Sequence, residues 1–369
     1  MRSTRRLGRR RRRRGLWWLL GAVFVLVVAA SAASFFVPAQ WVGRVIPGDS
    51  VVDSEAVAFL PGGAITTSNR IKADGIDVYE SEGEILLLTV SIDSELTVVD
   101  WIRSAVDEAV ELRSRESVFG DRSNQEQRDF NRHLMSSAKD TATIVALERL
   151  GVHAADFTGV LFVEAVAGGP ADGLLSSSDV ILSIDGLPVT TVESLLAVLG
   201  DLDPGTTATI TVEDAETEQR RDVELTLGAH PDSGGAYIGV SGVAERVQRS
   251  PLPFEIDISS GNVGGPSAGL AFTLLVLDVL TPGELTGGKR VAVTGSIRLD
   301  GSVGDVGGVA QKSVAARDAG AEIIMVPAAL VDEARSGAGE VPVVGVENLD
   351  DALEALAARG GDPVGRLDG

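Results

Sequence analysis

Residues 264–270 read Gly264-Gly265-Pro266-Ser267-Ala268-Gly269-Leu270, and the apolar run Leu-Ala-Phe-Thr-Leu-Leu-Val-Leu occupies residues 270–277. The glycines and the proline indicate a loop and the apolar run a buried helix, so we expect Ser267 in the first turn of that helix. First-turn N–H groups have no partner within the helix, and together with the helix dipole they stabilise negative charge. This placement suits a nucleophilic hydroxyl and the oxyanion of a tetrahedral intermediate.

Lys312 lies in the stretch 307–320, which predicts a short helix closed by the C-cap glycine Gly320. At 3.6 residues per turn its face is shared by Val309, Ala316 and Ala319, whereas Gln311, Arg317 and Asp318 point elsewhere. Burial among aliphatic side chains favours the neutral amine, which can accept a proton from serine. The pair therefore predicts a Ser-Lys dyad, with Ser267 as nucleophile and Lys312 as general base.

Several further motifs surround the dyad in order. Residues 293–297 read Val-Thr-Gly-Ser-Ile, residues 301–303 read Gly-Ser-Val, and a glycine pair at 307–308 precedes the lysine. Over residues 237–358 the sequence resembles the proteolytic domain of the Lon protease family. The resemblance implies Ser267 as nucleophile, Lys312 as base and Thr294 as a supporting hydroxyl. Members of that family often carry an aspartate three residues before the serine, where this chain has Gly264.

The loop around the nucleophile supplies the other candidate residues of the catalytic site. We expect Gly265, Pro266 and Ala268 to surround the oxyanion. Two alternatives remain for this region. In the first, Ser267 only caps the helix and the ammonium of Lys312 only binds backbone carbonyls. In the second, folding brings a histidine to Ser267 and completes a triad, for which the chain offers His133, His153 and His230.

The composition narrows the class of protein. The chain has 369 residues, 44% hydrophobic residues and no cysteine, which excludes a thiol nucleophile, a cysteine zinc site and disulfides. Nine of the 32 basic side chains are arginines within residues 1–15. The rest of the chain has 23 basic and 53 acidic side chains, and its formal charge is −30. Such an acidic body does not bind nucleic acid. We expect no metal and no cofactor.

The arginine-rich segment 1–15 is followed by an uncharged apolar run that predicts a transmembrane helix over residues 16–38. The positive-inside rule then places the N-terminus in the cytoplasm and the rest of a single-pass protein outside the cell membrane. Small residues at 29–33 leave a cleaved signal peptide as an alternative.

Residues 39–150 predict a membrane-proximal region without catalytic residues. Strands are expected at residues 57–60 and 85–90, with a turn at 61–63, and helices at 97–114 and 124–150. His133 on the second helix is interpreted as a surface residue.

Residues 151–230 resemble a PDZ domain, with Phe-Thr-Gly-Val at 157–160, Gly-Pro-Ala at 169–171 and Asp-Val-Ile-Leu-Ser-Ile-Asp-Gly at 179–186. Ser178 stands where PDZ domains usually have glycine. The resemblance implies that Gly159, Val160, Leu161 and Phe162 bind a peptide as an added strand. The alternative is a small domain that only braces its neighbour.

After a linker, residues 235–360 form the expected proteolytic domain, with strands at 323–327 and 341–346, a final helix capped by Asn348, and a tail at 361–369. The predicted fold class is mixed α+β. Residues 283–290 nearly fit a phosphate-binding loop, but Arg290 replaces the Ser/Thr that would hold Mg²⁺.

The sequence thus predicts a membrane-anchored, ATP-independent serine endopeptidase. Its expected substrates are unfolded or exposed protein segments captured by the PDZ domain. The resemblance also implies a homo-oligomeric ring, such as a hexamer. The alternative is a PDZ-based envelope scaffold whose Lon-like domain is latent or cuts only itself.

Overall fold

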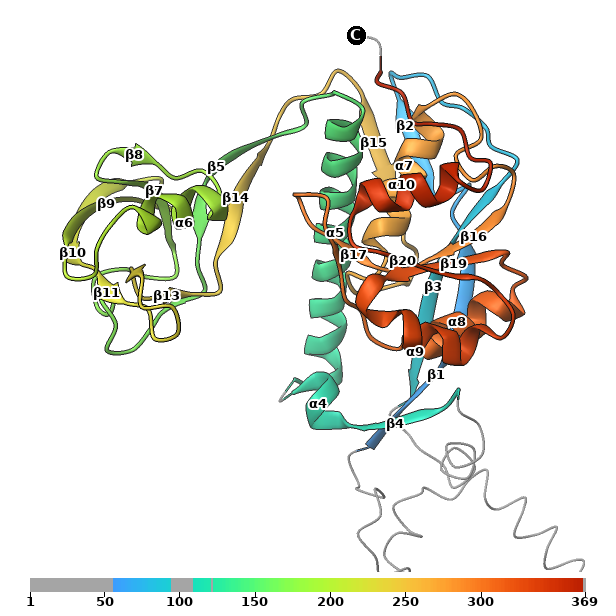
Figure 1. Cartoon of the computed structure of the whole chain (residues 1–369), viewed down its shortest axis with the longest axis horizontal. Coiled ribbons are helices and arrows are strands. Elements are labelled where there is room, and N and C mark those ends of the chain that lie inside the picture. Colours follow the sequence, from blue (N-terminus) through green and yellow to red (C-terminus); the bar gives the residue numbers. More distant parts are fainter. Residues whose placement is uncertain (1–55, 94–108, 121, 368–369) are drawn as a thin grey trace, which may run out of the picture. The chain divides into compact units, whose positions relative to one another are not determined.

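A computed structural model describes residues 56–93, 109–120 and 122–367 of the chain (Figure 1). The predicted basic segment 1–15 and transmembrane helix 16–38 lie outside the described residues, as do residues 39–55 and most of the helix expected at 97–114. Among the helices that the structure describes, none is both long and apolar enough to cross a membrane.

The chain divides into two compact units. One is built from residues up to 152 together with residues 254–369, and the other from residues 153–253. The PDZ-like unit is therefore inserted into the unit that contains Ser267 and Lys312, called here the catalytic unit. The expected boundaries were different, because residues 39–150 had been predicted as a region separate from the catalytic domain.

The catalytic unit is organised around a six-stranded sheet in the order β20-β19-β16-β3-β1-β4. Its strands are β1 (Ala56–Thr66), β3 (Glu84–Asp93), β4 (Glu111–Ser114), β16 (Arg290–Val293), β19 (Ile323–Pro327) and β20 (Val343–Val346). Strands β3, β16, β19 and β20 are parallel neighbours, whereas β1 pairs antiparallel with both β3 and β4. Because β3 pairs directly with β16, part of the region 39–150 completes the sheet of the catalytic unit.

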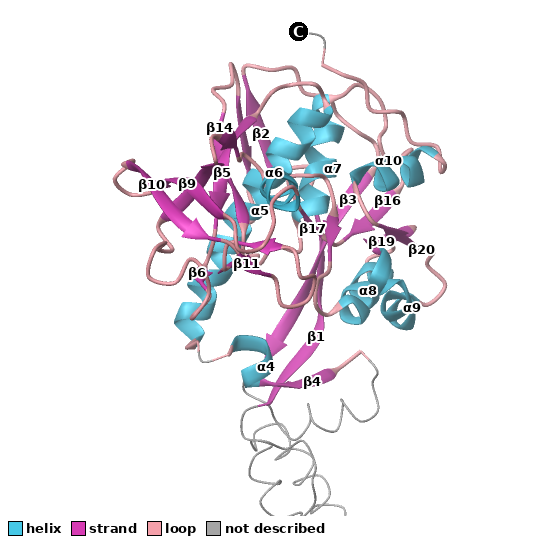
Figure 2. Ribbon diagram, turned by 60° about the vertical axis from the view of Figure 1, so that its left-hand side comes forward, coloured by secondary structure: helices cyan, strands magenta, loops and turns pink. Residues whose placement is uncertain are grey.

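Helices cover this sheet, with α8 (Val309–Asp318) and α9 (Val331–Ala338) lying together beside it (Figure 2). Leu86 and Leu88 of β3 pack with Val309 and Ala316 of α8 in one core. Ile85 and Leu87, which alternate with them along the strand, are also buried, so both faces of β3 are covered.

Two further helices position the nucleophile loop. Helix α7 (Gly269–Leu280) is buried at every residue except Val279, as its apolar sequence predicts. Helix α5 (Asn124–Arg149) matches the helix expected at 124–150 and begins with a capping box of Ser123 and Glu126. The remaining elements are β2 (Ile71–Asp74), α4 (Arg115–Phe119), β15 (Glu255–Ile258), β17 (Ser296–Ile297), β18 (Val303–Gly304), the 3₁₀ turn η1 (Ala328–Leu330) and α10 (Leu349–Ala357).

Two local predictions for this unit differ from the structure. Strand β1 runs through Pro61-Gly62-Gly63, where we expected a turn, because a register shift between Pro61 and Ala64 absorbs these residues as a bulge. The end of the helix expected at 97–114 is instead strand β4, which pairs with β1. The prediction of Asn348 as the cap of the last helix is confirmed, since its side chain accepts from Asp351 N–H at 2.9 Å.

The inserted unit has a twisted sheet in the order β10-β9-β7-β5-β14, and helix α6 packs on it. These elements are β5 (Ala155–Leu161), β7 (Asp179–Ile184), α6 (Val192–Gly200), β9 (Thr207–Asp214), β10 (Arg220–Thr226) and β14 (Ala244–Arg249). Short pairs are made by β6 (Glu164–Ala165), β8 (Leu187–Pro188), β11 (Gly228–Ala229), β12 (Ala236–Tyr237) and β13 (Val240–Ser241). The unit extends beyond residue 230, because β13 and β14 pair with β6 and β5 before the chain leaves at Pro253.

Candidate active site

Ser267 is half-buried in the turn that leads into α7. The helix begins at Gly269 with Ala268 as its N-cap, so Ser267 precedes the first turn rather than lying in it. Its carbonyl accepts hydrogen bonds from Gly295 N–H at 3.0 Å and from Thr294 Oγ1 at 3.3 Å. These two contacts fix the backbone of the serine against the end of β16.

Lys312 is buried on α8, with 2% of its surface exposed. Burial lowers the pKa of its ammonium group to about 8, although the carboxylate of Glu333 acts in the opposite direction. The amine Nζ donates to Thr294 Oγ1 at 3.1 Å. Lys312 therefore has the two properties expected of a general base: a pKa close to neutral and a fixed orientation.

Thr294 connects the two candidate catalytic residues. Its hydroxyl donates to the Ser267 carbonyl and so presents a lone pair to Lys312 Nζ. A neutral amine that donates one N–H to Thr294 keeps its own lone pair free for another hydroxyl. In this structure Lys312 Nζ donates to Thr294 Oγ1 rather than to the hydroxyl of Ser267.

The backbone of the loop leaves two N–H groups for an oxyanion. Gly265 N–H is not one of them, because it donates to the Asn131 carbonyl of α5 at 2.8 Å, and Pro266 has no N–H. The N–H groups of Ser267 and Ala268 have no acceptor among the residues described. Of the predicted loop residues, Ala268 remains a candidate donor, Ser267 N–H joins it, and Gly265 and Pro266 only shape the loop.

Gly264, where the resemblance leads one to expect aspartate, lies against α5. A Cβ at this position would come within 3.0 Å of Asn131 Cβ, which is closer than side chains ordinarily pack. The contact between α5 and the loop thus favours glycine here. Asn131 was missed by sequence reasoning, because nothing in the sequence indicates that a helix so far from the loop in the chain would hold it.

The start of α8 depends on a carboxylate that the sequence did not single out. Glu333 of α9 accepts from Val309 N–H at 3.0 Å and from Ala310 N–H at 3.4 Å. The N-cap residue Gly308 has a φ of 68° and offers no side chain for this purpose. Glu333 therefore caps the helix that carries Lys312.

One prediction about α8 is wrong. Gln311 was expected to point away from the buried face, yet it is only 1% exposed. Both Gln311 Oε1 and Ser313 Oγ lack partners in the described structure. The helix lies between the sheet and α9, so more than one of its faces is buried.

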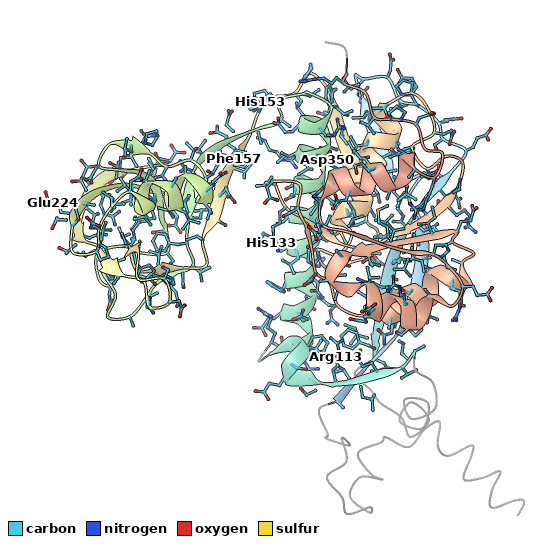
Figure 3. The ribbon with its side chains drawn as sticks, viewed as in Figure 1. Arg113, His133, His153, Phe157, Glu224 and Asp350 are labelled. Atoms are coloured by element: carbon cyan, nitrogen blue, oxygen red, sulfur yellow. The ribbon has the colours of Figure 1, made fainter. Side chains whose placement is uncertain are left out.

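One of the three histidines belongs to the catalytic unit and two belong to the inserted unit. His133 is exposed on α5, as expected of a surface residue (Figure 3). His153 and His230 belong to the inserted unit, where His153 Nε2 bonds to Asp156 Oδ1 at 3.0 Å and His230 packs edge-on against Tyr237. Lys312 is thus the basic side chain that the fold links to Ser267.

The near match to a phosphate-binding loop has a structural role. Lys289 Nζ donates to the Arg359 carbonyl at 2.7 Å, and Glu284 accepts from Glu82 N–H at 2.7 Å. The loop ties α7 and β16 to neighbouring segments, so its lysine is already occupied. Among the described residues, no cluster of three histidine or acidic side chains could hold a metal ion.

The residues predicted to bind peptide in the inserted unit lie in the interior of its sheet. Gly159, Val160 and Leu161 belong to β5, which pairs with β7 on one side and β14 on the other, and Phe162 follows them into the core. A strand with two neighbours cannot add a peptide. The edge beside α6 instead belongs to β14, because Glu245 of β14 accepts from Val192 N–H at the start of α6 at 3.3 Å.

Comparison with known protein families agrees with both units. The model of the Lon protease (S16) C-terminal proteolytic domain matches residues 254–356, and the PDZ domain model matches residues 121–225. The chain carries a Lon-type proteolytic domain and a PDZ domain. The Lon match begins at residue 254, whereas the structure adds β1, β3 and α5 to the same unit, and the PDZ match ends before β14.

Curated Lon proteases resemble the same part of the chain. The Lon protease of Phenylobacterium zucineum is 38% identical over 103 residues and that of Clostridioides difficile is 37% identical over 106 residues. Each alignment covers 27% of this chain and 13% of the relative, so the chain spans about an eighth of the length of these proteins. The likeness supports a serine peptidase domain.

Two solved structures resemble part of the chain. The PDZ domain of an SdrC-like protein from Listeria monocytogenes is 21% identical, with 23% of this chain and 86% of that chain covered and a TM-score of 0.21. A protein from Geobacillus thermodenitrificans is 26% identical, with 23% and 97% covered and a TM-score of 0.20.

Proposed function

We propose that this chain is a serine endopeptidase that hydrolyses peptide bonds of exposed or unfolded protein segments without ATP. The observation that carries the proposal is the hydrogen-bonded series from Lys312 Nζ through Thr294 Oγ1 to the Ser267 carbonyl, with burial lowering the lysine pKa to about 8. The Lon-type domain match supports the same chemistry.

The mechanism follows from these groups. Neutral Lys312 takes the proton of Ser267 Oγ while this oxygen attacks the substrate carbonyl carbon, and the N–H groups of Ser267 and Ala268 hold the oxyanion. The C–N bond then breaks as Lys312 gives its proton to the leaving amine, which leaves an acyl-enzyme. Lys312 next removes a proton from water as the water oxygen attacks the ester carbon. The ester C–O bond then breaks, the acid fragment leaves, and Lys312 returns the proton to Ser267 Oγ. In this proposal the Ser267 hydroxyl turns toward Nζ to complete the dyad.

The PDZ unit captures substrate in this proposal. The edge of β14 offers unpaired backbone groups beside α6, which suits addition of an extended segment as a further strand. Leu196 on α6 and Val243 before β14 are exposed apolar side chains near this edge, so we propose an apolar residue at the end of the captured segment.

Anchoring and assembly belong to the proposal as well. The apolar run 16–38 would hold the protein in the cell membrane, with residues 1–15 cytoplasmic and the two units outside. ATP independence is supported by the occupied lysine of the loop at 283–290. We also propose a homo-oligomeric ring, such as a hexamer.

The test is cleavage of casein by the full chain in detergent without nucleotide, comparing wild type with Ser267→Ala and Lys312→Ala. We expect wild type to produce fragments and both variants to produce none. Equal behaviour of all three proteins would reject the dyad and favour the alternative, a PDZ-based scaffold with a latent domain. A fixed truncation of wild type alone, without casein cleavage, would indicate self-processing.

A further inference from the structure

A pocket of about 520 Å³ lies between α5 and residues 260–264, the segment that leads into the nucleophile loop. The α5 wall is a single stripe of side chains, because its members recur every three or four residues along the helix. These are Arg128, Asn131, Arg132, Met135, Ser136 and Lys139. Since Gly265 N–H bonds to the Asn131 carbonyl, the pocket wall and the loop of Ser267 are directly connected.

The lining has three cations and no carboxylate. Arg132 is neutralised outside the pocket by a hydrogen-bonded ion pair with Asp129. Arg128 donates to Gln125 Oε1 at 3.0 Å and Lys139 donates to the Ile258 carbonyl at 2.9 Å. Neither forms an ion pair with a carboxylate in the part of the chain that is described. An arginine has five N–H donors and a lysine has three, so both retain donors for a ligand.

This positive pocket contrasts with the chain around it, whose formal charge is −21. The overall field of such a protein repels acidic substrates, so attraction of a carboxylate depends on local cations. Gly264 also lines the pocket. An aspartate at this position would place a carboxylate in the wall, whereas glycine leaves the pocket positive.

We propose that this pocket is a substrate subsite that binds an aspartate or glutamate side chain close to the scissile bond. The chain therefore prefers peptide segments with an acidic residue at one fixed distance from the bond attacked by Ser267. Arg128 and Lys139 are the specificity-determining residues. The inference rests on the proposed peptidase function, and it adds the chemical class of the preferred substrate.

The experiment uses the full chain in detergent with internally quenched peptides. Their C-termini are amidated, so that capture of a free carboxylate by the PDZ unit does not contribute. Each position around the scissile bond carries Asp, Asn or Lys in turn, and kcat/KM is measured. Binding of the same peptides to Ser267→Ala, followed by fluorescence anisotropy, gives a readout that does not require hydrolysis.

At one position we expect Asp to be preferred over Asn by about three- to tenfold, as for a charge-assisted contact in a partly solvated site. The preference should fall at high salt, because screening weakens exposed charge pairs. It should fall to near unity in the Arg128→Gln/Lys139→Gln double variant, and Arg128→Glu should favour Lys instead. Arg335→Gln removes an exposed arginine of α9 that pairs with Asp332 and should leave the preference unchanged.

Two results separate this inference from the proposed function. If wild type cleaves peptides but shows no preference for Asp at any position, or keeps it in the double variant, the subsite is refuted and the peptidase stands. If wild type cleaves nothing while Ser267→Ala binds acidic peptides selectively through Arg128 and Lys139, the subsite stands and the hydrolysis is refuted.

Discussion

Among the described residues, the buried carboxylates of the PDZ unit form ion pairs with arginines, whereas buried Lys312 and Asp278 of the catalytic unit form none. Asp179 of β7 is fully buried, and Arg221 of β10 donates to its two oxygens at 2.5 and 2.7 Å. Burial alone would raise the pKa of Asp179, but the hydrogen bonds from Arg221 and Ser176 outweigh it and the pKa is lowered. This carboxylate therefore stays charged.

In the catalytic unit, burial outweighs the interactions that would keep the two buried groups charged. Burial lowers the pKa of Lys312 to about 8, and burial with repulsion from Glu284 raises the pKa of Asp278 on α7 to about 6. Asp278 Oδ1 also lacks a hydrogen-bond partner among the described residues. The paired carboxylate therefore stays charged, whereas Lys312 and Asp278 are shifted toward their neutral forms, which is the state that the proposed general base needs.

The largest effect should follow replacement of Lys312 by methionine. Without the base, we expect kcat/KM for peptide cleavage to fall by at least about a thousandfold. In wild type, activity should rise with pH through about 8, because Lys312 must lose its proton to act. A pH–rate profile measures both, and a profile that stays flat between pH 6 and 9 would contradict the role given to Lys312.

The same variant should be more stable than wild type at neutral pH. The folded pKa of Lys312 lies below the ordinary 10.5, so the unfolded chain binds more protons between about pH 8 and 10.5. Burial of the ammonium therefore costs most below about pH 8, and the cost disappears as pH rises toward 10.5. Lys312→Met should raise the free energy of unfolding at pH 7 by up to about 3 kcal/mol, measured by urea denaturation.

Breaking the PDZ pair should give the next largest change. Arg221→Met leaves the buried carboxylate of Asp179 without its partly exposed cation, which costs about 1–3 kcal/mol. Arg220→Met is the matched control, because Arg220 is exposed and its partner Glu213 keeps Arg246 at 2.6 Å. Hydrogen exchange of β7 peptides should show much faster opening in the first variant and little change in the second. Equal exchange in the two variants would mean that the buried pair contributes no stability.

Much of this fold could be predicted from sequence because its helices are local patterns. Helix α5, α8 and the Asn348 cap follow from periodicity and capping residues. The insertion of the PDZ unit could not be predicted in this way. It follows from the pairing of β3 with β16, which are about 200 residues apart, and no local signal specifies that pairing.

The candidate site shows the same division. Ser267, Lys312 and Thr294 could be singled out from their sequence motifs, and two hydrogen bonds connect them in the structure. Asn131, Glu333 and the exposed edge of β14 were missed, since each acts through a contact between distant segments. Gly159 was misassigned because a strand sequence does not reveal whether one neighbour or two will pair with it.

A smaller gain in stability is expected from Asp278→Asn. The folded pKa of about 6 exceeds the ordinary 3.8, so the folded chain binds more protons between these values and loses stability as pH rises through them. The variant should raise the free energy of unfolding at pH 7 by about 1–3 kcal/mol and leave it nearly unchanged at pH 4. Asp350→Asn, at an exposed position, should have no such pH-dependent effect.

The smallest effect is expected from Glu333→Gln, which tests whether the catalytic unit tunes its unpaired lysine. The Glu333 carboxylate raises the pKa of Lys312 against the effect of burial, so its removal should move the rise of kcat/KM to lower pH. The variant should also lose about 1 kcal/mol of stability, because a neutral amide caps α8 less well than a carboxylate. Asp332→Asn, one residue earlier and paired with Arg335 at the surface, is the matched control and should move neither quantity. A loss of stability without a displaced pH profile would make Glu333 a helix cap only, whereas displacement to lower pH requires that its charge reach Lys312.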